Sequence, residues 1–115
     1  MMKYKPQHAE QAVEILERLL PRVSPRAEYF ELIEILKQPK RWKEAHGHFF
    51  KIRVNITIPL EAHKKRTLDE RFACLAENAA KTAYNCSGES DPFDNDSFAR
   101  LLKCQEELSA PLKAE

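Results

Sequence analysis

Residues 67–85, TLDERFACLAENAAKTAYN, carry the clearest structural pattern in the chain. Thr67 and Glu70 have the T-x-x-E spacing of a capping box, which satisfies free backbone amides at the start of a helix. The apolar side chains that follow recur every three or four residues, as on one face of an α-helix. We therefore predict a helix at 67–85, whose alanines allow another helix to pack closely. The apolar residues are Leu68, Phe72, Leu75, Ala76, Ala79, Ala80, Ala83 and Tyr84.

A different spacing precedes this helix. In residues 48–58, HFFKIRVNITI, apolar side chains alternate with polar or basic ones. Alternation with a period of two is typical of a β-strand that buries one face and exposes the other. The sequence therefore predicts a long strand at 48–58 that ends at Pro59.

A lone strand leaves its backbone amides and carbonyls without partners, so the predicted strand must pair with another strand. We expect the same strand of a second copy to pair with it, which gives a homodimer joined by a two-stranded antiparallel ribbon. A hairpin with part of residues 28–46 of the same chain is the alternative.

Helical spacing also marks the two ends of the chain. Residues 7–37 predict an α-hairpin, residues 38–47 a basic loop, and residues 95–108 a last helix before a frayed tail at 109–115. The predicted fold class is therefore α+β and mainly helical, in the order α-α-β-α-α, within a single domain at 1–115. The apolar faces predict a core of Val13, Leu16, Leu20, Leu32, Ile33, Leu36, Ile52, Val54, Ile56, Phe72, Leu75, Ala79, Phe98, Leu101 and Leu102.

Composition excludes several classes of function. The chain has 115 residues, of which 43% are hydrophobic and 32% charged, as in one soluble globular domain. Two glycines are too few for a Gly-rich phosphate-binding loop, and no GxSxG, HExxH or SxxK motif occurs. We therefore expect no enzymatic activity and no cofactor. No apolar run reaches the roughly 18 residues of a membrane span, so we expect no membrane partner.

The three cysteines are Cys74, Cys86 and Cys104. Their odd number, wide spacing and lack of a CxxC pair argue against a disulfide framework. Such a set favours a reducing compartment, so we expect structural thiols and a cytoplasmic location.

The net charge of +1 conceals a strong asymmetry along the chain. Residues 37–66 contain nine Lys or Arg and two Asp or Glu, whereas residues 67–115 contain five and ten. A basic middle segment can attract nucleic acid or an acidic protein. It can also pair with the acidic C-terminal third of the same chain, or form an ordinary solvated surface.

In a paired ribbon, the polar faces of two copies of residues 48–58 would lie side by side. Together they would have a width that a DNA major groove admits. The segment KIRVNITIP at 51–59, with helices after it, resembles the ribbon-helix-helix family of DNA-binding dimers. The resemblance implies a homodimer that binds nucleic acid through the ribbon. The candidate contact residues are Lys51, Arg53, Asn55 and Thr57, supported by Lys40, Arg41, Lys43, Lys64, Lys65 and Arg66.

Ring side chains in the basic segment have two interpretations each. Trp42 can stack on a nucleic-acid base, or it can anchor the loop on the core. His46 and His48 form an H-x-H pair whose imidazoles share one face of an extended segment, and His63 lies further along. Zinc would need further ligands, so ordinary polar histidines are the alternative to a metal site.

Three functional hypotheses follow from these patterns. The first is a small, non-catalytic intracellular binding or adaptor protein that acts through a protein partner. The second is a nucleic-acid-binding homodimer that presents the basic face of the ribbon. The third is a small enzyme or metal protein that uses the loop histidines. The first hypothesis is favoured because it requires the least of the sequence, and it rests on the small size, the lack of a catalytic motif and the opposite charges of different segments.

Overall fold

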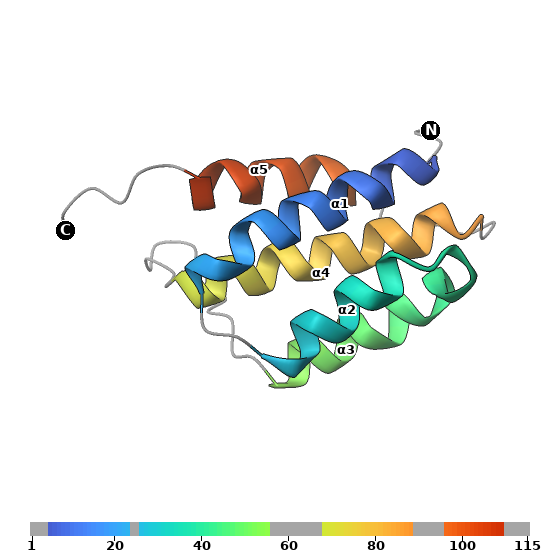
Figure 1. The fold of residues 1–115 in the computed structure, drawn as a ribbon, viewed down its shortest axis with the longest axis horizontal. Coiled ribbons are helices and arrows are strands. Elements are labelled where there is room, and N and C mark those ends of the chain that lie inside the picture. The colour runs from blue at the N-terminus through green and yellow to red at the C-terminus, as the bar shows by residue number, and fades with distance from the viewer. Residues whose placement is uncertain (1–4, 24–25, 56–67, 89–95, 110–115) are drawn as a thin grey trace, which may run out of the picture.

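The computed structural model describes residues 5–23, 26–55, 68–88 and 96–109. Within these ranges the chain is helical and contains no strand. The elements are α1 (Pro6–Leu19), the 3-10 turn η1 (Leu20–Arg22), α2 (Ala27–Leu36), the 3-10 segment η2 (Pro39–Glu44), α3 (Ala45–Asn55), α4 (Leu68–Cys86) and α5 (Ser97–Ser109) (Figure 1).

Helix α4 lies at the centre of the bundle (Figure 1). It contacts α1, α2, α3 and α5, so its side chains are enclosed from several directions. Helices α1 and α5 run alongside each other on one side of α4, and α2 and α3 lie on the other side. Alanines cover much of the α4 surface, and small side chains let neighbouring helices approach closely. The buried alanines of α4 are Ala73, Ala76, Ala79, Ala80 and Ala83.

The predicted strand at 48–58 is wrong for the residues that the structure describes, because residues 48–55 belong to α3. Ala45, His48 and Ile52 are all buried, and their spacing of three and four residues is that of a helix. A strand would place Phe50 and Ile52 on the same buried face, but Phe50 is 49% exposed while Ile52 is fully buried. The helical conformation explains this difference, because residues two apart point to nearly opposite sides.

The helical conformation of α3 also removes the reason for predicting a ribbon, which was the lack of hydrogen-bond partners for a lone strand. A helix satisfies its amides and carbonyls internally, so α3 needs no strand from a second copy. The α+β class, the order α-α-β-α-α and the ribbon-mediated homodimer are therefore corrected to a small, compact, helical fold. Residues 56–58 of the predicted strand lie outside the described residues.

The core prediction is confirmed at nine positions and wrong at Leu102, which is 41% exposed on α5. Val13, Leu20 and Phe98 are half-buried at the edge of the core. The side chains of Val54 and Ile56 lie outside the described set. The confirmed residues are Leu16, Leu32, Ile33, Leu36, Ile52, Phe72, Leu75, Ala79 and Leu101.

Candidate functional site

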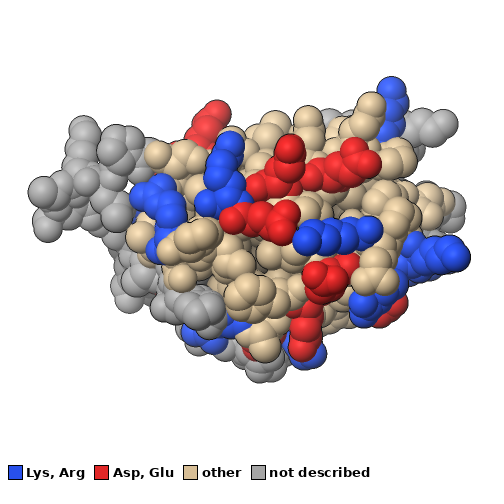
Figure 2. Space-filling model, viewed as in Figure 1, with Lys and Arg blue, Asp and Glu red and all other residues tan. Residues whose placement is uncertain are grey.

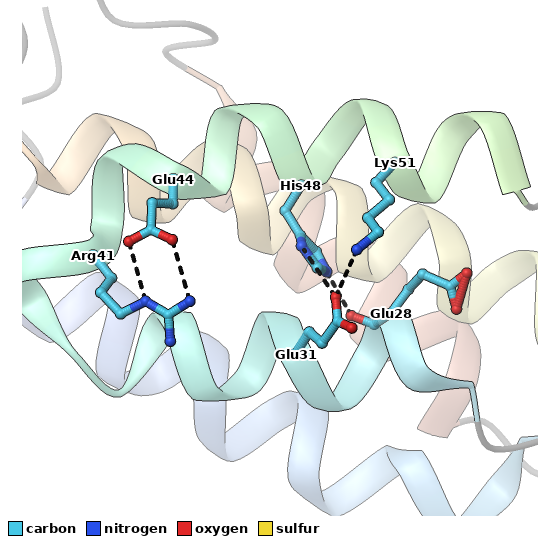
Figure 3. A network of polar contacts seen from close by, with 6 residues as sticks. All are labelled: Glu28, Glu31, Arg41, Glu44, His48 and Lys51. Atoms are coloured by element: carbon cyan, nitrogen blue, oxygen red, sulfur yellow. Dashed lines mark hydrogen bonds and ion pairs between the residues drawn. The ribbon is translucent and has the colours of Figure 1, made fainter.

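Polar contacts join α3 to α2 (Figure 3). The His48 imidazole is buried, and its Nε2 lies 2.7 Å from the backbone carbonyl oxygen of Glu28. Because a carbonyl oxygen only accepts, this nitrogen carries the hydrogen and donates it. The His48 Nδ1 lies 3.9 Å from Oε2 of Glu31, which also accepts a hydrogen bond of 2.9 Å from Lys51 Nζ. The hydrogen bond from Lys51 and its positive charge lower the pKa of Glu31.

A second ion pair lies on η2, close to the first (Figure 3). Arg41 donates from Nε and Nη2 to the two carboxylate oxygens of Glu44, at 3.1 and 3.2 Å. This two-point contact raises the pKa of Arg41 and lowers the pKa of Glu44. Both side chains remain partly exposed, so the pair sits at the surface rather than in the core.

These pairs surround a hollow of about 450 Å³ between α2, η2 and α3, which we call the polar hollow. Its walls include Arg41, His48 and Lys51, and α2 contributes Phe30 and Glu34. Arg41 and Lys51 lie at the rim of the hollow, whereas His48 is buried. The hollow therefore offers fixed polar groups to whatever binds there.

A neighbouring hollow of about 520 Å³ lies where the end of α1 meets α2, and we call it the apolar hollow. Leu20, Pro21, Val23 and Ile33 give it apolar walls. Phe30 and Glu34 line this hollow as well as the polar one. We call these two shared residues the Phe30–Glu34 ridge.

The ridge combines an exposed aromatic ring with an acidic surface. Phe30 is 50% exposed, and Glu34 follows it by one helical turn on the same side of α2. Figure 2 shows acidic side chains gathered over α1 and α2, with basic side chains among them. The exposed acidic residues of α1 are Glu10, Glu14 and Glu17.

The structure brings Arg41 and Lys51 of the predicted nucleic-acid contacts to the polar hollow, where each is paired with a carboxylate. Lys40 and Lys43 are exposed on η2. The prediction placed these contacts on one face of a strand, but the described residues of this segment form the helix α3. Arg53 and Asn55 belong to α3, but their side chains lie outside the described set. Wholly outside the described residues are Thr57, His63, Lys64, Lys65 and Arg66.

Trp42 occupies the core instead of the surface. Only 5% of it is exposed, and its Nε1 donates a 2.9 Å hydrogen bond to the backbone carbonyl oxygen of Leu36. This contact ties η2 to the end of α2 and satisfies the indole N–H. Trp42 therefore has the anchoring position that the sequence analysis gave as the alternative to base stacking.

His46 and His48 point in different directions because α3 is a helix. The His46 ring lies 5.2 Å from the ring of Phe50 and 5.0 Å from the ring of Tyr84, measured between centroids. His48 instead faces α2. Within the described residues, no three His, Cys, Asp or Glu side chains are grouped as a metal would require.

The Phe30–Glu34 ridge was not among the sites predicted from the sequence. One signal was present: Phe30 stands off the apolar stripe formed by Tyr29, Leu32, Ile33 and Leu36. An aromatic residue on the polar side of an amphipathic helix is a candidate for a contact surface. The hollows on either side of the ridge depend on how α2 meets α1 and α3, which the spacing in α2 does not contain.

Comparison of the chain with protein-family models, with curated proteins and with solved structures finds no match. None of the described helices combines the length and hydropathy needed to span a membrane.

Proposed function

We propose that this chain is a small, non-catalytic binding protein that docks a segment of a protein partner on the Phe30–Glu34 ridge. The observation that carries the proposal is the half-exposed Phe30 ring between two hollows of about 450 and 520 Å³. Exposed aromatic rings beside pockets are typical anchors of protein interfaces, because they bury much apolar area at little cost in conformational entropy.

The two hollows suit different parts of one partner segment. The apolar hollow can accept a bulky aliphatic or aromatic side chain against Leu20, Val23 and Ile33. The polar hollow presents two ion pairs at its rim, whose exposed atoms can form hydrogen bonds with polar groups of a partner. A short amphipathic segment with apolar and polar side chains on adjacent positions matches both.

The state of His48 supports binding over catalysis. Its Nε2–H is committed to the Glu28 carbonyl, and its ring is buried between α2 and α3. Arg41 and Lys51 are each bound to a carboxylate. These groups position the walls of the polar hollow. No disulfide joins Cys74, Cys86 and Cys104, which all lie among the described residues, and this supports the cytoplasmic setting that forms part of the proposal.

Display of random peptides against the untagged full chain tests the proposal. We expect enrichment of peptides that combine a bulky apolar residue with polar neighbours. Phe30→Ala should weaken the best peptide about fivefold or more, because half a phenylalanine side chain contributes about 1 kcal/mol when buried. Circular dichroism would verify that the variant is folded.

The matched control is Leu102→Ala, which removes a similarly exposed apolar side chain from α5, outside both hollows. Peptide affinity should be unchanged in this variant. The proposal fails if no peptide is enriched, or if the two substitutions have equal effects on affinity.

A further inference from the structure

Glu34 differs from the other carboxylates around the two hollows. Glu17 is 3.2 Å from Lys37, Glu31 is 2.9 Å from Lys51, and Glu44 is held by Arg41. The Glu34 carboxylate makes no hydrogen bond or ion pair with any residue that the structure describes. Arg41 attracts it through space, but the Arg41 hydrogen bonds go to Glu44. The ridge therefore retains one carboxylate that can accept hydrogen bonds from a partner.

Phe30 supplies the second half of a cation site. Its ring is half exposed, and the Glu34 carboxylate stems from the next turn of the same helix face. The face of an aromatic ring carries negative electrostatic potential and attracts a cation within about 6 Å. The exposed Phe30 ring and the Glu34 carboxylate lie on adjacent turns, so both can attract the same cation.

We infer that the ridge recognises the guanidinium group of an arginine in the partner segment. This inference rests on the proposed docking function and specifies its ligand chemistry. The guanidinium plane stacks on the Phe30 ring while its N–H groups donate to the Glu34 carboxylate. Arginine suits this site better than lysine, because its flat, weakly hydrated head can stack and donate two parallel hydrogen bonds at once.

Both hollows are consistent with an arginine at the ridge. An apolar residue beside the arginine reaches the apolar hollow, whose walls include Leu20 and Val23. On the other side, the exposed ion pairs of Arg41 and Lys51 keep those cations on their own carboxylates. The incoming guanidinium thus competes with no hydrogen bond that Glu34 makes among the described residues.

Nuclear magnetic resonance titration of the isotope-labelled full chain tests this inference without knowledge of the partner. The probes are N-acetylarginine amide, N-acetyllysine amide and N-acetylcitrulline amide, at low ionic strength. Citrulline keeps the shape of arginine and lacks its charge. We expect saturable shifts at Phe30 and Glu34 with the arginine probe, with a dissociation constant on the order of 1 mM for a ligand of this size.

The lysine probe should bind at least threefold more weakly, and the citrulline probe should give no saturable shift. Glu34→Gln should abolish the response to arginine, whereas Glu10→Gln, an exposed position on α1, should preserve it. Phe30→Leu keeps an apolar side chain and should reduce the preference for arginine over lysine.

Equal shifts with arginine and citrulline would overturn the inference, and equal affinity for arginine and lysine would reduce the ridge to a nonspecific acidic surface. With either result, the display experiment could still yield peptides whose binding depends on Phe30. Failure of the docking function appears separately, as the absence of such peptides from the display experiment.

Discussion

The hydroxyl of Thr82 on α4 lies 3.0 Å from the hydroxyl of Ser97, the first residue of α5. Both side chains are fully buried, and Thr82 Oγ1 also lies 2.8 Å from the backbone carbonyl oxygen of Asn78. The amide of Asn85 reaches Ser97 Oγ at 3.4 Å. Polar groups in a buried helix interface need partners, so this contact fixes which residue of α5 lies beside Thr82.

We predict that Ser97→Ala destabilises the protein by about 1–3 kcal/mol, because it removes the buried oxygen that faces both Thr82 and Asn85. Thr82→Val should cost about 1 kcal/mol. Urea denaturation of both variants and of the double variant measures the coupling between the two side chains. Strictly additive losses would show that the hydroxyl pair contributes nothing as a pair.

The helical conformation of α3 predicts losses of stability of different size at two apolar residues that are two positions apart. Ile52→Ala should destabilise the protein by about 3 kcal/mol, because Ile52 is fully buried and leaves a cavity. Phe50→Ala should cost less than about 1 kcal/mol, since half of its side chain already faces solvent. Urea denaturation measures both. Equal and large losses would contradict the exposed position of Phe50 on α3.

The ion pair between Glu31 and Lys51 predicts a pH dependence of stability. Lys51 lowers the pKa of Glu31 below its ordinary value of 4.5. The pair therefore stabilises the folded chain above pH 4.5, and this contribution is lost as the pH falls through the pKa of folded Glu31. The melting temperature of Lys51→Met should be below that of the wild type at neutral pH, and the two should converge in acid.

The control for this comparison is Lys103→Met, which removes an exposed lysine from α5. Its melting temperature should follow that of the wild type at every pH. High salt should reduce the Lys51→Met difference at neutral pH, because the pair is exposed and screened. A difference that persists in acid would assign the effect to packing of the lysine stem.

Burial raises the pKa of the Cys86 thiol to about 11. The thiol also donates to the backbone carbonyl oxygen of Lys5 at 3.2 Å. At pH 8 about one thiol in a thousand is ionised, so iodoacetamide should modify Cys86 slowly in the folded chain. The rate should rise about tenfold per pH unit up to the pKa.

Unfolding in urea should accelerate modification at pH 8 about a hundredfold, because the pKa returns to its ordinary value of 9.0. Peptide mapping by mass spectrometry separates Cys86 from Cys74 and Cys104. Equal rates for Cys86 in folded and unfolded chains would contradict the effect of burial on its pKa.

Local pattern was sufficient for the helices whose apolar stripe faces the core. The helix predicted at 67–85 corresponds to α4 at Leu68–Cys86, and the one predicted at 95–108 corresponds to α5 at Ser97–Ser109. Helical periodicity is a property of neighbouring residues, so it can be read without knowing what packs against it. Leu102 shows the limit of this method, because its exposure depends on whether another helix covers that part of α5.

Residues 48–55 show how tertiary contacts can override a local pattern. Their alternation favours a strand, but the helix buries Ala45, His48 and Ile52 together and gives the His48 ring a partner on α2. His48 counts as a polar residue in the sequence, so the helical spacing of Ala45, His48 and Ile52 was not recognised as a buried face. The group that allows His48 to be buried, the backbone carbonyl of Glu28, lies 20 positions away in the chain.

The sequence by itself determined that the chain forms amphipathic helices and that α4 is rich in alanine, because both follow from the order of the side chains. Only the tertiary structure decided that Phe30 and Glu34 stand between two hollows. A hollow exists where packed helices leave the space between them unfilled. Its position therefore follows from how α1, η2 and α3 pack around α2, which no local spacing contains.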